Sequence, residues 1–106
     1  MKILIADKLS PNLFASLENL GADIISNANI SAEDLIEVIG DTNVLIVRST
    51  KVLAKTIENG GKLQLIIRAG AGVNNIDLEI ASNNGVFVAN CPGKNSDAVA
   101  ELALGH

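Results

Sequence analysis

The chain has 106 residues, with eight Lys or Arg against twelve Asp or Glu and a formal net charge of −4 at pH 7. At 48% hydrophobic and 19% charged it is too apolar to be disordered, because disordered chains combine low hydrophobicity with high charge. At roughly 100–200 residues per domain, we expect one small domain or a piece of a larger protein.

Charge and cysteine content exclude several classes of partner. The mild acidity argues against nucleic acid, whose phosphates require a basic surface. No apolar run reaches the roughly 18 residues of a membrane span, and Asp7 interrupts the first run before a secretory signal could form. One cysteine supplies neither a disulfide framework nor a metal-ligand set. We therefore expect a cytoplasmic protein with no metal site and no contact with nucleic acid or membrane.

Five short apolar runs begin at intervals of roughly 20 residues, a length that fits a strand followed by a crossover helix. Most of them are continuous rather than alternating, which is typical of a parallel sheet with helices on both faces. The expected strands are Lys2–Ala6, Ala22–Ile25, Val44–Val47, Leu63–Ile67 and Val86–Ala89.

The intervals between the strands carry signals that start and stop helices. Small polar residues stand at most of the expected N-caps, and Gly or Asn stands where the helices would end. The expected helices are bounded by Ser10 and Gly21, Ser31 and Gly40, and Val52 and Ile57. A fourth is capped by Asp77 or a neighbouring Asn and ends at Asn84-Gly85, and a last helix starts at Asn95 or Ser96.

This alternation of strands and helices predicts an α/β fold. With right-handed crossovers, the simplest arrangement is a flavodoxin-like, doubly wound sheet of five parallel strands in the order 2-1-3-4-5. Ligands of such sheets bind outside the carboxyl ends of the strands. Functional residues are therefore expected directly after each strand.

Asp7 follows the first strand. A phosphorelay receiver would have an acidic pair here, a phosphorylatable Asp after the third strand and a Lys after the fifth. This chain has Arg48 and Asn90 at those two places. A receiver is excluded, and Asp7 is interpreted as a turn or cap residue.

The third strand is followed by Arg48-Ser49-Thr50-Lys51. An arginine beside two hydroxyls and an ammonium group can form a cradle for an anion, since Arg grips carboxylate or phosphate with two hydrogen bonds. The alternative is an Arg paired with a neighbouring carboxylate and hydroxyls that cap the next helix. Both interpretations remain open for this segment on its own.

The fourth strand runs into Arg68, Ala69 and the turn Gly70-Ala71-Gly72. Asn75 stands where a third glycine would complete the G-x-G-x-x-G fingerprint of dinucleotide binding, so this is not that fingerprint. An isolated G-x-G is more often only a tight turn. A second arginine at a neighbouring strand end, however, favours a small dianionic ligand held by two cations and a group of backbone amides.

The fifth strand leads into Asn90-Cys91-Pro92-Gly93, followed by Asn95 and Ser96, which cap the last helix or reach the ligand. Cys91 is interpreted as an inert thiol, because a nucleophile needs a base within reach and the only histidine is His106. No carboxylate pair, metal-ligand cluster or Ser/His/Asp set is visible.

Two segments carry a resemblance to a known family. VLIVRSTKV (44–52) and LIIRAGAGVNNIDLEIASNNGVFVANCPGKNSDAVAEL (65–102), after an N-terminal MKILIAD, resemble the amino-terminal half of a D-2-hydroxyacid dehydrogenase. The resemblance implies an NAD-dependent oxidoreductase with two domains and a homo-oligomeric full-length protein. It places residues 1–92 in the substrate-binding domain and residues 93–106 at the start of a crossover helix toward a nucleotide-binding domain, which would bind most of the NAD.

The resemblance also implies roles for individual residues. Arg48 and Arg68 would face the phosphate and carboxylate of 3-phosphoglycerate or a similar hydroxyacid, and the amides of residues 70–72 would hold the carboxylate. Ala71 would also lie near the nicotinamide of the cofactor. The implied substrate-binding residues are Arg48, Ser49, Thr50, Arg68, Gly70, Ala71, Gly72 and Asn95.

The family's catalytic Arg, Glu and His and its nucleotide-binding turn lie in segments that this sequence lacks. The chain is therefore expected to be a fragment that is not catalytic alone, since hydride transfer needs a cofactor and a base positioned against the substrate. Two alternatives remain. One is a dehydrogenase for an unphosphorylated acid such as glycerate, lactate or formate, and the other is a stand-alone module that binds small anions.

Overall fold

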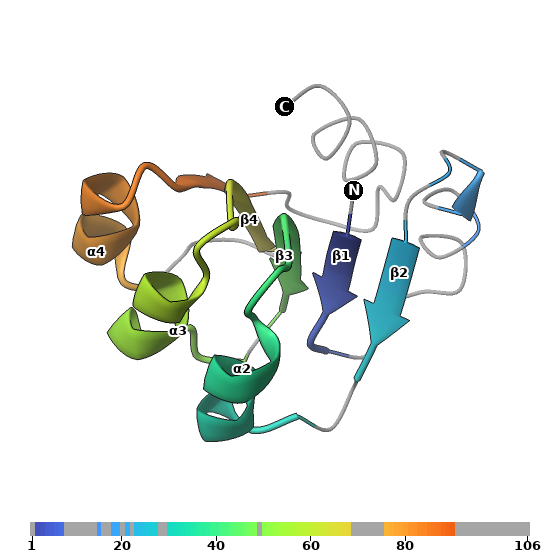
Figure 1. The fold of residues 1–106 in the computed structure, drawn as a ribbon, viewed down its shortest axis with the longest axis horizontal. Helices are drawn as coiled ribbons and strands as arrows, with labels where there is room; N and C mark the ends of the chain where they lie inside the picture. Colours follow the sequence, from blue (N-terminus) through green and yellow to red (C-terminus); the bar gives the residue numbers. More distant parts are fainter. Residues whose placement is uncertain are drawn as a thin grey trace.

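The computed structural model describes residues 2–7, 15, 18–19, 21, 23–27, 30–48, 50–68 and 76–90. Within these ranges, five strands form one sheet in the order β2-β1-β3-β4-β5, and every neighbouring pair is parallel (Figure 1). The predicted strand order is confirmed. The strands are β1 (Lys2–Ile5), β2 (Asp23–Ser26), β3 (Val44–Val47), β4 (Leu65–Arg68) and β5 (Phe87–Asn90).

In the described part of the chain, three helices lie side by side against one face of the sheet (Figure 1). They are α2 (Ala32–Val38), α3 (Ala54–Asn59) and α4 (Leu78–Asn83). Two of them begin at the predicted caps, because the side chain of Ser31 accepts a hydrogen bond from the Asp34 amide and that of Asp77 accepts one from the Ile80 amide, each at 3.1 Å. These short side chains satisfy amides that the first turn of a helix leaves unpaired.

The third expected helix begins later than predicted. Leu53 is the N-cap of α3, and Val52 instead pairs with Ile76 in an isolated parallel β-bridge. The apolar spacing from Val52 to Ile57 is compatible with a helix, but the backbone of Val52 continues the pairing of β3 with β4 beyond the ends of these strands.

Two glycines end helical segments in the way the sequence predicts. Gly21 and Gly85 adopt positive φ values of 78° and 71°, which a residue without Cβ tolerates at a helix end. Gly40 follows the C-cap of α2 without a positive φ, and the chain leaves this helix through a turn in which the Thr42 amide donates to the Ile39 carbonyl at 2.8 Å. Most of the segment between Ser10 and Gly21, and the whole of the last expected helix, lie outside the described residues.

Both faces of the sheet are buried. On the face under α2, α3 and α4, side chains of the strands, helices and loops form one cluster: Leu4, Ala6, Ile30, Leu35, Ile39, Leu45, Val47, Val52, Ile57, Leu63, Ile66, Ile76, Ala81 and Val86. Alternation along the strands places a second set on the opposite face, where Ile3, Ile5, Val44, Ile46, Leu65 and Ile67 are at most 3% exposed. A parallel sheet covered on both faces confirms the predicted doubly wound fold.

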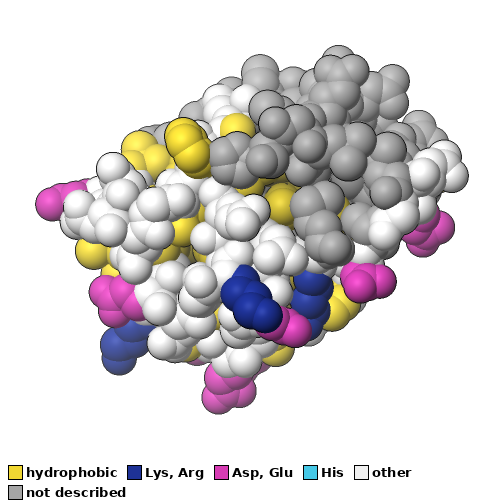
Figure 2. Space-filling model, turned by 45° about the horizontal axis from the view of Figure 1, so that its top comes forward, with side chains coloured by type: hydrophobic (Ala, Val, Ile, Leu, Met, Phe, Trp, Pro, Cys, Tyr) yellow, Lys and Arg dark blue, Asp and Glu magenta, His cyan; other side chains and the backbone are white. Residues whose placement is uncertain are grey.

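Burial decreases toward the two outer strands. Ile25 of β2 is 44% exposed and Phe87 of β5 is 63% exposed. Phe87 borders a shallow groove of about 300 Å³, which Leu78 and Ser82 of α4 also line. Figure 2 shows hydrophobic side chains on the surface at the α4–β5 end of the molecule. No helix within the described ranges is long and apolar enough to cross a membrane.

Polar contacts fix the amino-terminal end of the sheet. The side chain of Asn43 accepts from the Lys2 amide at 2.9 Å and donates to the Lys62 carbonyl at 3.3 Å, so it joins the starts of β1 and β3 to the approach to β4. Lys2 Nζ also donates to Asp41 Oδ1 at 2.5 Å, and this contact lowers the pKa of the exposed Asp41 carboxyl. The strands therefore start in a fixed register, which determines where they end.

We expect Ile66→Ala to destabilise the fold far more than Ile25→Ala, although both remove the same atoms from a strand. Ile66 is fully buried under the helices, whereas Ile25 is 44% exposed. Truncating a buried isoleucine costs about 2–5 kcal/mol, a large part of a typical stability of about 5–15 kcal/mol. Urea denaturation followed by circular dichroism measures both values, and equal losses would contradict the assignment of Ile66 to the core.

Candidate functional site at the carboxyl ends of β1, β3 and β4

The strand order reverses at β1. β2 lies on one side of β1, and β3, β4 and β5 follow on the other. In open parallel sheets, the loops diverge at such a switch point and leave a crevice outside the carboxyl ends of the strands. The ladder between β1 and β3 extends to this edge, since the Ala6 amide donates to the Ile46 carbonyl at 3.0 Å. Asp7 follows Ala6 directly, and Arg48 follows Val47, the last residue of β3.

The carboxylate of Asp7 holds the loop that follows β3. Its Oδ2 accepts from the amide of Arg48 at 2.6 Å and from the amide of Thr50 at 3.1 Å. Its Oδ1 accepts from the hydroxyl of Thr50 at 2.9 Å. The sequence interprets Asp7 as a turn or cap residue, whereas in the structure its carboxylate accepts from the amides of a loop 41 and 43 residues away in the sequence.

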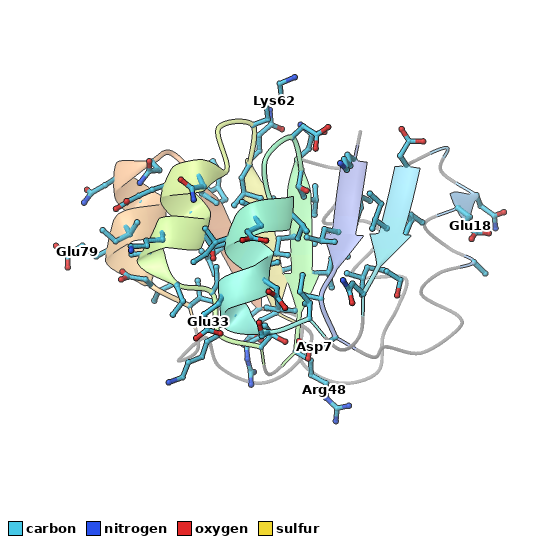
Figure 3. The ribbon with its side chains drawn as sticks, turned by 60° about the horizontal axis from the view of Figure 1, so that its bottom comes forward. Asp7, Glu18, Glu33, Arg48, Lys62 and Glu79 are labelled. Carbon is cyan, nitrogen blue, oxygen red and sulfur yellow. The ribbon has the colours of Figure 1, made fainter. Side chains whose placement is uncertain are left out.

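Arg48 and Arg68 stand at the ends of neighbouring strands. β3 pairs with β4 so that Val47 lies opposite Arg68, and Arg48 is the next residue. Arg68 shares the face of Val47 and Ile66 and is half-buried. Arg48 is exposed, and Figure 3 shows its side chain pointing away from the end of the sheet, next to Asp7. The structure thus brings both arginines to one edge and gives them different environments.

The loops after β3 and β4 are joined at both ends. They start at the pair Val47 and Arg68 and they end at the bridge between Val52 and Ile76. The first loop therefore has four residues, 48–51, and the second has seven, 69–75. Residues 69–75, which contain the Gly70-Ala71-Gly72 turn, lie outside the described residues. Arg68 and Ile76, which flank this segment, pair with Val47 and Val52, which flank the Arg48 loop.

Three of the eight predicted site residues lie within the described part of the chain. Arg48, Thr50 and Arg68 lie together at the carboxyl edge, whereas Ser49, Gly70, Ala71, Gly72 and Asn95 lie outside the described residues, as does Cys91. Sequence reasoning missed the anchoring role of Asp7 and the bridge at Val52. The available signal for the first was an acidic residue directly after the first strand, at the place where the predicted strand order reverses.

The contacts of Asp7 limit what the Arg48 loop can offer to a ligand. The hydroxyl of Thr50 has one hydrogen and donates it to Asp7, whose carboxylate also occupies the amides of Arg48 and Thr50. The Arg48 guanidinium is exposed, and this planar donor group can bind a carboxylate or phosphate with two hydrogen bonds. Among the described residues, no three His, Cys, Asp or Glu side chains gather as a metal ion would require.

These features define a doubly wound α/β domain whose candidate site lies at the carboxyl edge of the sheet, beside the switch point. Residues 3–103 match the family of D-isomer specific 2-hydroxyacid dehydrogenases, catalytic domain, and the chain belongs to this family. The resemblance found in the sequence is thereby confirmed.

Individual relatives agree with this assignment. The D-3-phosphoglycerate dehydrogenase of Rattus norvegicus is 47% identical over 98% of this chain, and the hydroxypyruvate reductase of Thermotoga maritima is 40% identical over 93%. The NAD⁺-bound crystal structure of 3-phosphoglycerate dehydrogenase from Entamoeba histolytica superposes with a TM-score of 0.79 over 99% of this chain, at 36% identity. The chain spans 20%, 32% and 37%, respectively, of the lengths of these three proteins.

We expect Asp7→Asn to destabilise the fold by about 1.5–3 kcal/mol, the usual contribution of hydrogen bonds to a charged group. The asparagine amide keeps the shape of the side chain. Its NH₂ group, however, replaces one of the two accepting oxygens and therefore faces a hydrogen-bond donor of the loop. Asp23→Asn is the matched control, since Asp23 is an exposed residue of β2. Urea denaturation at pH 7 measures both variants, and indistinguishable midpoints would contradict the anchoring role of Asp7.

Proposed function

We propose that this chain is the substrate-binding part of an NAD-dependent D-3-phosphoglycerate dehydrogenase that converts 3-phosphoglycerate to 3-phosphohydroxypyruvate in serine biosynthesis. The observation that carries the proposal is the pair of arginines, Arg48 and Arg68, at the ends of adjacent strands beside the switch point. The 47% identity to the rat enzyme over nearly the whole chain supports the choice of substrate.

3-Phosphoglycerate has an anionic group at each end and the reacting carbon next to its carboxylate. Arg48, on the exposed side of the edge, binds the phosphate. Arg68 and the backbone amides of Gly70, Ala71 and Gly72 bind the carboxylate, with Ser49, Thr50 and Asn95 lining the same crevice. Gripping a small substrate at both ends fixes the direction of its C2–H bond, which is the positioning that hydride transfer needs.

The turn after β1 does not fit the pyrophosphate of a dinucleotide. The turn after β1 carries Asp7, whose negative charge would repel a pyrophosphate, instead of the G-x-G-x-x-G that binds one. NAD supplies a hydride acceptor when it is bound, and in this proposal another part of the full-length protein holds most of it, with Ala71 as the contact from this chain.

The division of the chain follows from the same proposal. Residues 1–92 belong to the substrate-binding domain, and residues 93–106 begin the crossover toward the nucleotide-binding domain. The full-length protein is a cytoplasmic homo-oligomer in this proposal, and the residues that transfer the proton lie outside this chain. Sedimentation of the full-length protein tests the oligomeric state.

A second candidate is an enzyme for an unphosphorylated hydroxyacid. The 40% identity to the hydroxypyruvate reductase of Thermotoga maritima favours it. The two candidates differ in what Arg48 binds, because an unphosphorylated acid offers only its carboxylate as an anion.

We expect Arg48→Ala in the full-length protein to reduce kcat/KM for 3-phosphoglycerate by roughly 10- to 100-fold, with a much smaller effect on D-glycerate. A charge-assisted pair contributes about 1.5–3 kcal/mol, and only the phosphorylated acid can make this one. Lys62→Ala is the control, since it removes the same charge at the opposite end of the sheet (Figure 3). Steady-state kinetics with both acids measures the effect.

Equal losses for the two acids would assign Arg48 to the carboxylate. Turnover of D-glycerate as fast as that of 3-phosphoglycerate by the unaltered protein would favour the second candidate.

A further inference from the structure

We propose that Asp7 is a positioning residue: its carboxylate shapes the loop after β3 so that Arg48 presents its guanidinium to the phosphate of the substrate. The inference rests on the proposed function, and it deepens it by naming the residue that controls Arg48. Asp7 does not itself touch the substrate in this proposal.

Three contacts of Asp7 fix the loop at two points. Both carboxylate oxygens are used, and the partners are the Arg48 amide at 2.6 Å, the Thr50 amide at 3.1 Å and the Thr50 hydroxyl at 2.9 Å. The Thr50 hydroxyl also lies 3.4 Å from the Ala6 carbonyl. Because the amide of Arg48 is held to the end of β1, the backbone of Arg48 is fixed, and so is the direction in which its side chain leaves the chain.

This constraint matters because Arg48 is long and exposed. Binding a ligand orders both the side chain of an exposed arginine and the loop that carries it, and each ordering costs entropy. A loop that is already fixed removes the second of these costs. The opposite end of the loop is also fixed, at the bridge between Val52 and Ile76. Arg48 therefore projects from a short loop held on both sides.

The carboxylate also decides where an anion can bind on this loop. Successive backbone amides that point to one place form an anion-binding nest, and Asp7 already fills the position in front of the amides of Arg48 and Thr50. An incoming phosphate is thereby directed to the guanidinium of Arg48. Asp7 thus acts as an internal anion that the ligand does not displace.

Two effects of removing the charge have opposite signs, which makes the inference testable. By Coulomb's law alone, Asp7→Asn removes a negative charge close to a bound dianion and should tighten its binding. If Asp7 positions Arg48, the same substitution should weaken binding. The sign of the change in KM therefore separates positioning from simple repulsion.

The experiment uses steady-state kinetics of the full-length protein with 3-phosphoglycerate. We expect Asp7→Asn to raise KM by about tenfold, the equivalent of about 1.4 kcal/mol, and to leave kcat within about twofold. Thr50→Val should raise KM by less than Asp7→Asn does, and Thr50→Ser, which keeps the hydroxyl, should leave KM near that of the unaltered protein. In an Arg48→Ala background, Asp7→Asn should add less than about a twofold change, because the residue it positions is gone. Asp23→Asn is the charge-matched control.

Several results would overturn the inference. These are a lower KM in Asp7→Asn, an equal effect of this substitution with and without Arg48, or a fall in kcat alone that matches a loss of folded protein. If Asp7→Asn does not fold, Thr50→Val and Thr50→Ser make the same comparison.

A second measurement separates failure of the positioning role of Asp7 from failure of the proposed function. Hydrogen–deuterium exchange of the peptide that contains residues 46–51, in the full-length protein, reports the anchor without any substrate. Faster exchange in Asp7→Asn supports the anchor, and unchanged exchange overturns the inference. An unchanged KM for 3-phosphoglycerate in Arg48→Ala would instead overturn the proposed role of Arg48 in substrate binding.

Discussion

The bonds from the Asp7 carboxylate to the loop after β3 are the interaction on which the candidate site depends. The ends of β1 and β3 would otherwise diverge at the switch point, where no further ladder hydrogen bonds join them. A carboxylate is suited to this position because it accepts several hydrogen bonds at once, and its charge makes them stronger than bonds to a neutral acceptor. The amides of Arg48 and Thr50 and the hydroxyl of Thr50 are all satisfied in this way.

The buried sheet makes such a long-range contact possible. Aliphatic side chains cover both faces of β1, β3 and β4, so a shift of register by one residue would turn each strand's side chains to the wrong face. Because Asn43 ties the starts of β1 and β3 to the approach to β4, the positions of Asp7, Arg48 and Arg68 are set by strand length alone. The hydrophobic core thus fixes the geometry of the polar edge.

The sequence predicts the parts of this structure that depend on neighbouring residues. Continuous apolar runs predict the strands, and Ser31 and Asp77 cap helices that start one residue later. The contacts of Asp7 could not be predicted, because its partners lie 41 and 43 residues away and only the register brings them together. For the same reason the sequence predicts a helical Val52, whereas Val52 pairs with Ile76, beyond the next strand. The sequence leaves open whether the Thr50 hydroxyl faces a ligand or caps the next helix, and the structure shows this hydroxyl donating to the carboxylate of Asp7.

In the proposed site, the two arginines bind different ends of the substrate, and the choice follows from how buried each one is. Arg68 lies at the edge of the cluster under the helices, on the face of Val47 and Ile66, and the lower dielectric there strengthens its attraction for a carboxylate. This suits the end of the substrate that carries the reacting carbon, whose position must be held closely. Arg48 is exposed and meets an anion in a more aqueous setting, where solvent weakens each contact. Its contribution then depends on how well the loop orients it, and in our proposal the Asp7 carboxylate, just after β1, sets that orientation.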